Sequence, residues 1–125
     1  MFTILIVDDE KKIRNVYKAL FEHEGYYVIT VANIIEARTF LMAVPIDLML
    51  LDINMCDYNG DILYEVVKNF HKNVRIIISS VYPVEDQKLL MSEAVDYFDK
   101  AEGTKLLLEK VRNLLNQNPV ISHSI

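Results

Sequence analysis

The chain has 125 residues, which suits a single domain, and 52% of them are hydrophobic, enough to build a core without disulfides. A net charge of −5 argues against direct binding to nucleic acid or to an anionic membrane, and the single cysteine excludes an internal disulfide. No apolar run approaches the roughly 20 residues of a membrane span, and the N-terminus lacks the pattern of a signal peptide. These features predict a cytoplasmic protein.

Short apolar runs rich in branched residues predict five strands along the chain. The predicted strands are Thr3–Val7, Tyr27–Val31, Leu48–Leu51, Arg75–Ile78 and Asp96–Phe98. The third is the most apolar, as expected at the centre of a parallel sheet that helices cover on both faces.

Segments with helical spacing of apolar residues alternate with these strands. The predicted helices are Lys11–Glu24, Ile34–Ala43, Asp61–Phe70, Val84–Ser92 and Thr104–Asn116. Gly25 is placed to end the first helix, and Asn59-Gly60 marks a turn in the loop after the third strand. The alternation predicts an α/β fold with a doubly wound, five-stranded parallel sheet of order 2-1-3-4-5 and five helices. We expect one domain over residues 1–118, with residues 119–125 as a tail or the start of a linker.

Residues suited to metal or phosphate chemistry follow four of the predicted strands. They are Asp8 and Asp9 after the first, Asp52 after the third, Ser79 and Ser80 after the fourth, and Lys100 after the fifth. The carboxyl ends of parallel strands share one edge of the sheet, where ligands bind in such folds. Clustered carboxylates oppose one another's ionisation, and a hard divalent cation such as Mg²⁺ relieves that repulsion. The pattern favours a site where a carboxylate accepts a phosphoryl group, although Asp8 and Asp9 taken alone could equally cap the first helix.

Motifs in a specific order and spacing resemble those of response-regulator receiver domains of two-component signalling. They are ILIVDDE, EGYYVITVANIIEA, MLLDINM around Asp52, Asn59-Gly60, IIISS and DYFDK ending at Lys100, and the likeness covers residues 2 to about 116. The resemblance implies that Asp52 accepts a phosphoryl group from a sensor histidine kinase or a phosphotransfer protein. It also implies a Mg²⁺ cofactor, with Asp9 as a direct ligand, Asp8 reaching the metal through water, and Asn54 offering its backbone carbonyl.

The same resemblance assigns the groups that would respond to the phosphoryl group. Lys100 matches the lysine that pairs with the phosphoryl oxygens, and Ser80 matches the hydroxyl that follows them, with Ser79 one residue out of register. Tyr97 matches the aromatic residue that moves between outward and inward positions. The face from the fourth strand to the fifth helix would then change conformation. A homodimer through the helix four to helix five part of that face is a possible consequence. The domain would be no enzyme beyond its own phosphorylation and dephosphorylation.

One departure from the family and three other functions bear on this interpretation. Ala101 stands where many members have a proline in a cis peptide, so we expect a trans bond and a less constrained loop at Lys100. A phosphatase of the haloacid dehalogenase family would need an acid at position 54, where this chain has Asn54. A flavodoxin-like carrier of FMN would need hydroxyls after the first strand, where this chain has acids. A receiver that serves only as a docking module is the remaining alternative.

Overall fold

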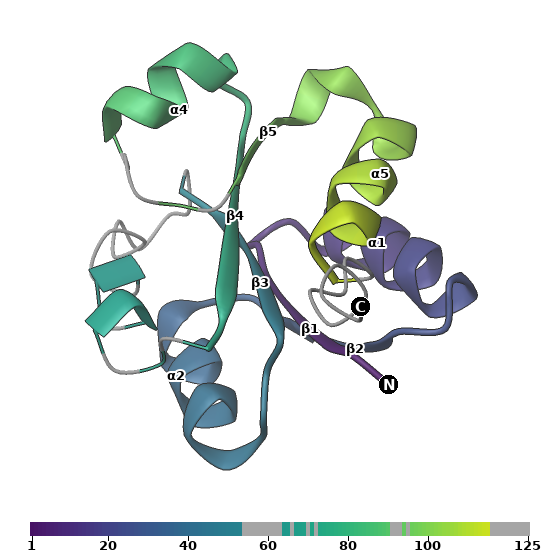
Figure 1. The fold of residues 1–125 in the computed structure, drawn as a ribbon, viewed down its shortest axis with the longest axis vertical. Coiled ribbons are helices and arrows are strands. Elements are labelled where there is room, and N and C mark those ends of the chain that lie inside the picture. Colours follow the sequence, from purple (N-terminus) through teal and green to yellow (C-terminus); the bar gives the residue numbers. More distant parts are fainter. Residues whose placement is uncertain are drawn as a thin grey trace, which may run out of the picture.

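A parallel five-stranded sheet forms the centre of the molecule (Figure 1). The computed structural model describes residues 1–53, 64–65, 67–69, 71, 73–90, 94 and 96–115. Its strands are β1 (Thr3–Val7), β2 (Tyr27–Val31), β3 (Leu48–Asp52), β4 (Arg75–Ser80) and β5 (Asp96–Asp99). They lie in the order β2-β1-β3-β4-β5, which confirms the predicted topology.

Helices cover both faces of this sheet. They are α1 (Lys11–His23), α2 (Ile34–Ala43), α4 (Val84–Leu90) and α5 (Thr104–Leu115), with a 3₁₀ turn η1 (Lys100–Glu102) before α5. In Figure 1, α1 and α5 lie on one face and α2 and α4 on the other. Residues 64–65 and 67–69 are also helical and form the described part of the predicted helix Asp61–Phe70. Within the part of the chain that the structure describes, no helix is long and apolar enough to span a membrane.

Each face of the sheet has its own hydrophobic core, because side chains alternate between faces along a strand. In β1, Leu5 and Val7 pack into the core with α2, whereas Ile4 and Ile6 pack into the core with α1 and α5. Every residue of β3 is buried, as its apolar sequence predicts for a central strand. This arrangement fixes which residues reach the carboxyl edge of the sheet.

The elements differ from the prediction mainly where polar residues end a strand. Asp52 belongs to β3, and Ser79 and Ser80 belong to β4, because their backbones continue the ladder with the neighbouring strands. Gly25 has a φ of +93° just after α1, which confirms its predicted role at the helix end. The predicted turn at Asn59-Gly60 and the tail at residues 119–125 lie outside the described residues, so the domain boundary at residue 118 stays a prediction.

Candidate functional site

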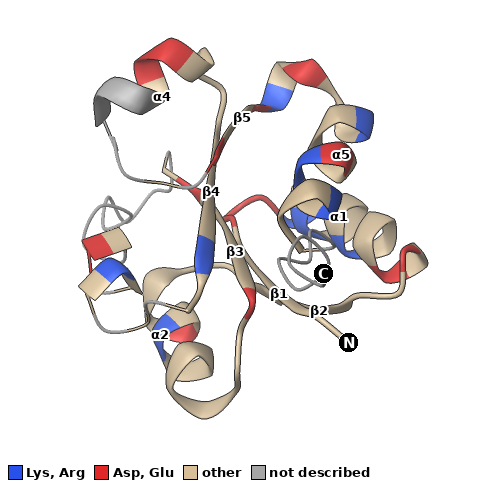
Figure 2. Cartoon of the chain, in the orientation of Figure 1, with Lys and Arg blue, Asp and Glu red and all other residues tan. Residues whose placement is uncertain are grey.

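Three carboxylates meet at the carboxyl edge of the two central strands. Asp8 follows β1 and Asp52 ends β3, and these strands pair in parallel. One oxygen from each of Asp8, Asp9 and Asp52 can be chosen so that all three lie within 4.8 Å of one another. Asp8 is only 2% exposed and Asp52 only 3%. Figure 2 shows the acidic connection between β1 and α1, to which Asp9 belongs.

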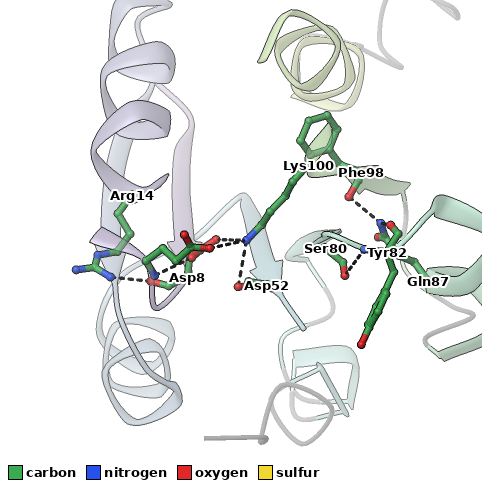
Figure 3. Close-up of polar contacts among 9 residues, drawn as sticks. Asp8, Arg14, Asp52, Ser80, Tyr82, Gln87, Phe98 and Lys100 are labelled. Atoms are coloured by element: carbon green, nitrogen blue, oxygen red, sulfur yellow. Dashed lines mark hydrogen bonds and ion pairs between the residues drawn. The ribbon is translucent and has the colours of Figure 1, made fainter. Parts of the chain in front are cut away.

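The ammonium group of Lys100 lies between two of these carboxylates (Figure 3). Its Nζ donates to Asp8 Oδ2 at 2.9 Å and to Asp52 Oδ2 at 3.2 Å. The Lys100 side chain is only 10% exposed. Burial alone would lower the pKa of Lys100, but the hydrogen bond to Asp8 and the charges of Asp52 and Asp8 outweigh it, so the pKa is raised above its ordinary value. Lys100 is therefore a fixed positive charge within an acidic site.

Local hydrogen bonds hold the backbone on both sides of Lys100. The Asp99 side chain accepts from the Ala101 N–H at 2.8 Å, and the Asp99 N–H donates to Glu102 Oε1 at 3.1 Å, which forms a capping box around η1. The Lys100–Ala101 bond is trans, as expected, since the described residues contain no cis peptide. The expectation of a less constrained loop stays a prediction, and the capping box identifies the hydrogen bonds that hold the loop in this conformation.

Asp8 makes hydrogen bonds to Lys100 and Arg14 in addition to the one at the start of α1. Its Oδ1 accepts from the Glu10 N–H at 2.9 Å, which organises the entry to α1, while its Oδ2 binds Lys100. Its backbone carbonyl accepts from Arg14 Nη1 at 2.9 Å (Figure 3). Glu10, the residue directly before α1, makes no side-chain cap. Sequence reasoning missed Arg14, because a spacing of six residues across a helix start gives no signal of contact.

The two serines of β4 occupy different positions relative to Asp52. Ser79 pairs with Asp52 on β3 and with Phe98 on β5, so it lies inside the sheet. Ser80 is the last residue of β4, and its Oγ accepts from the Tyr82 N–H at 3.1 Å (Figure 3). Both side chains are buried, but only Ser80 is bonded to the connection that leads into α4.

The remaining predicted residues are Tyr97 and Asn54. Tyr97 lies on β5, is 6% exposed and packs in the same core as Ile78, so the structure places it inward. Its role as a moving residue stays a prediction. Asn54 lies outside the described residues.

A buried phenol from α1 also belongs to the surroundings of the site. Tyr17 is 4% exposed and lies in the core between the sheet and the helices α1 and α5. Burial raises the pKa of Tyr17, the charge of Lys100 opposes that rise, and the charges of Asp8 and Asp52 add to it. Sequence reasoning missed the position of Tyr17 near the site, since a tyrosine on the apolar stripe of a helix is indistinguishable from ordinary core.

The donor set fits Mg²⁺. This ion prefers oxygen ligands, is usually held by one or two carboxylates, and keeps part of its coordination for water or phosphate. Asp8, Asp9 and Asp52 supply carboxylate oxygens close enough for one ion, and Asp8 and Asp52 come from buried positions that fix their side chains. The cofactor predicted from the sequence agrees with this geometry.

Comparison with known proteins gives a consistent result at the level of sequence. The family model described as the response regulator receiver domain matches residues 4–112. The response regulator SaeR of Staphylococcus epidermidis is 34% identical over 130 residues, which cover 99% of this chain and 55% of SaeR. The chain thus spans about half the length of this curated relative.

Solved structures with the same fold include one bound to a metal and one bound to a kinase. The response regulator TrrA of Thermotoga maritima, in complex with Mg²⁺–BeF, has a TM-score of 0.81 and 34% identity, covering 92% of this chain and 100% of that one. A chain in the complex of the histidine kinase ThkA with TrrA has a TM-score of 0.83 and 32% identity, covering 92% and 99%.

Proposed function

The chain belongs to the response regulator receiver domains, and from that membership we propose that Asp52 accepts a phosphoryl group in a Mg²⁺-dependent reaction. The observation that carries the proposal is the position of Lys100 Nζ, within 3.2 Å of Asp52 and 2.9 Å of Asp8. A buried nucleophilic carboxylate with a fixed cation and a carboxylate cluster for a metal beside it is what phosphoryl transfer requires.

In the proposed reaction a carboxylate oxygen of Asp52 attacks the phosphorus in line, and the bond from phosphorus to the donor breaks. Lys100 holds the Asp52 carboxylate in place and balances the charge of the incoming phosphoryl oxygens. Asp8 and Asp9 would hold Mg²⁺, which supplies further neutralisation of that charge when bound. Asn54 contributes its backbone carbonyl to the metal in this proposal, as the family resemblance implies.

We assign the response to phosphorylation to Ser80 rather than to Ser79. Ser79 pairs with Asp52 and Phe98 inside the sheet, whereas Ser80 pairs with Asp99 alone, at the end of β4 where the chain leaves the sheet. Ser80 is bonded to the Tyr82 N–H, so turning its hydroxyl toward a phosphoryl oxygen would release the connection between β4 and α4. Tyr97, which packs beside this region from β5, is the second group whose position would change.

The proposed partners, output surface and cellular location follow from the assignment of the chain as a receiver domain that is phosphorylated on Asp52. The complex of ThkA with TrrA supports a sensor histidine kinase, or a phosphotransfer protein, as the phosphoryl donor. The face from β4 to α5 is the proposed output surface, a homodimer through it is part of the proposal, and the net charge of −5 disfavours direct binding of this domain to nucleic acid. We further propose that the domain catalyses only its own phosphorylation and dephosphorylation, and that it acts in the cytoplasm.

Labelling with a small phosphoryl donor tests the assignment of Asp52. The protein is incubated with acetyl phosphate and Mg²⁺, and its intact mass is measured with and without EDTA. We expect one phosphoryl group in the wild type, which EDTA abolishes and which Asp52→Asn lacks. Asp47→Asn is the matched control, because Asp47 lies just before β3, at the other end of the strand, and accepts from the Thr3 N–H. Equal labelling of Asp52→Asn and the wild type would show that Asp52 is not the acceptor.

A further inference from the structure

A buried glutamine on α4 joins two segments that flank the site. Gln87 is 0% exposed. Its Nε2 donates to the Tyr82 carbonyl at 2.9 Å and to the Phe98 carbonyl at 2.8 Å (Figure 3). Tyr82 lies in the connection between β4 and α4, and Phe98 lies on β5, next to Tyr97. One amide therefore ties α4 to both.

The chemistry of these bonds fixes the orientation of the Gln87 amide. Both partners are carbonyl oxygens, which only accept, so the NH₂ end must face them and the oxygen must face away. Gln87 Oε1 is buried and accepts no hydrogen bond from the residues that the structure describes. A buried acceptor without a donor is unfavourable, so, with respect to the described residues, this atom is an acceptor that a new donor would stabilise.

The N–H of Tyr82 is a donor on a residue that Gln87 already contacts. It donates to Ser80 Oγ at 3.1 Å, while the carbonyl of the same residue is held by Gln87. When the Ser80 hydroxyl turns toward a phosphoryl group at Asp52, the Tyr82 N–H loses its acceptor. Tyr82, which loses a hydrogen-bond acceptor, is thus already bonded to Gln87, whose Oε1 can accept.

We propose that Gln87 is a positioning residue that takes over the Tyr82 N–H when Ser80 releases it, with Oε1 as the new acceptor. The amide then binds both backbone groups of Tyr82 and still holds the Phe98 carbonyl. The movement of Ser80 is in this way passed to β5 and to α4, while the Tyr82 N–H keeps an acceptor and Gln87 Oε1 gains a donor. The inference rests on the proposed function for the event that moves Ser80, but the hydrogen-bond exchange itself can be tested without any phosphoryl donor.

Removing the Ser80 hydroxyl by Ser80→Ala imitates its departure from Tyr82. We expect the Tyr82 N–H to stay protected from hydrogen exchange in Ser80→Ala, because Gln87 Oε1 accepts it. It should also stay protected in Gln87→Met, because Ser80 remains. In the double variant the exchange of this one amide, measured by NMR, should be about fivefold or more faster, the scale of one hydrogen bond.

The result that overturns the proposal is exchange at Tyr82 that is as fast in Ser80→Ala as in the double variant, since Gln87 would then play no part. Glu85→Gln, an exposed change on the same helix, is the control and should leave the Tyr82 amide unchanged in the Ser80→Ala background. If the Met variant does not fold, Gln87→Asn in that background replaces it. The shorter amide cannot span Tyr82 and Phe98, so it should accelerate the same exchange.

Phosphorylation is measured on the same variants, so the two proposals can fail separately. Gln87 does not contact Asp8, Asp52 or Lys100 among the hydrogen bonds of the site, so Gln87→Met should still be labelled by acetyl phosphate. Absence of labelling in the wild type would contradict the proposed function but would not affect the hydrogen-exchange result at Tyr82. Normal labelling together with unaltered exchange of the Tyr82 amide in the double variant would contradict only the role of Gln87.

Discussion

The sharpest prediction concerns the charge of Lys100. Replacing it by Met keeps the aliphatic stem but removes the ammonium that bridges Asp8 at 2.9 Å and Asp52 at 3.2 Å. Both carboxylates are at least 97% buried, so they cannot recover the lost interaction from water. Breaking a buried ion pair by deleting one partner costs about 3–5 kcal/mol, and we expect a loss of that size in the free energy of unfolding without Mg²⁺.

A second lysine of this chain provides the matched control. Lys110 Nζ lies 3.1 Å from Asp96 Oδ1, a similar distance, but the two side chains are 21% and 34% exposed. Exposed pairs contribute about 0.2–1 kcal/mol, so Lys110→Met should lose only that much. The two variants remove the same group at similar distances from its partners, so the difference between them measures burial together with the second carboxylate that Lys100 bridges.

Denaturant unfolding followed by circular dichroism, with and without Mg²⁺, gives both numbers. Mg²⁺ should stabilise Lys100→Met more than the wild type, because the ion then meets three carboxylates without a competing ammonium charge. It should not distinguish Lys110→Met from the wild type. Equal losses in the two lysine variants, or an equal response to Mg²⁺ in Lys100→Met and the wild type, would refute the reasoning.

Further predictions address the metal, the loop and the pH dependence. Asp9→Ala should abolish both Mg²⁺-dependent stabilisation and labelling by acetyl phosphate, and isothermal titration with Mg²⁺ checks the first directly. Asp99→Ala should break the capping box and cost about 0.5–2 kcal/mol in unfolding, with slower labelling of Asp52, whereas Glu102→Gln keeps an acceptor and should behave as the wild type. The raised pKa of Tyr17 means that the folded state holds its proton more tightly than the unfolded state, so this contribution to stability is present below pH 10 and is lost as the pH rises further. Tyr17→Phe should flatten that loss in unfolding curves recorded at increasing pH.

The sequence predicted most of the strands because burial and local pattern agree there. Thr3–Val7 and Tyr27–Val31 have the predicted bounds, since apolar runs followed by acids or turn residues leave little choice of end. The apolar pattern does not predict the extension of β4 over Ser79 and Ser80, because their polar side chains end the apolar run. Backbone pairing decides a strand end: Ser79 has a partner on both β3 and β5, and Ser80 has one on β5.

The convergence of Asp8, Asp52 and Lys100 was predictable for a different reason. It follows from the parallel topology alone, which brings the carboxyl ends of strands to one edge whatever the loops do. Gln87 and Arg14 were missed because each makes its contacts by side-chain reach to backbone carbonyls, which no residue pattern encodes. Gln87 did leave one trace, a polar residue three positions after Val84 on a short helix, where an inward-facing residue is expected to be apolar.

The loop at Lys100 shows how one chain can reach a site geometry without a residue that its family commonly uses. A proline restricts a backbone covalently, whereas at Lys100 of this chain local hydrogen bonds hold the backbone. Here Asp99 accepts from the Ala101 N–H and donates its own N–H to Glu102, and Gly103 leaves the turn with a φ of +90°. These bonds are exposed, so each is individually weak, and the position of Lys100 depends equally on the two buried carboxylates at its other end. The backbone of Lys100 is thus held by the capping box, and its ammonium group is held by the ion pairs with Asp8 and Asp52. A phosphoryl group at Asp52 would change only the ion pairs, so β5 and η1 would carry that change toward α5.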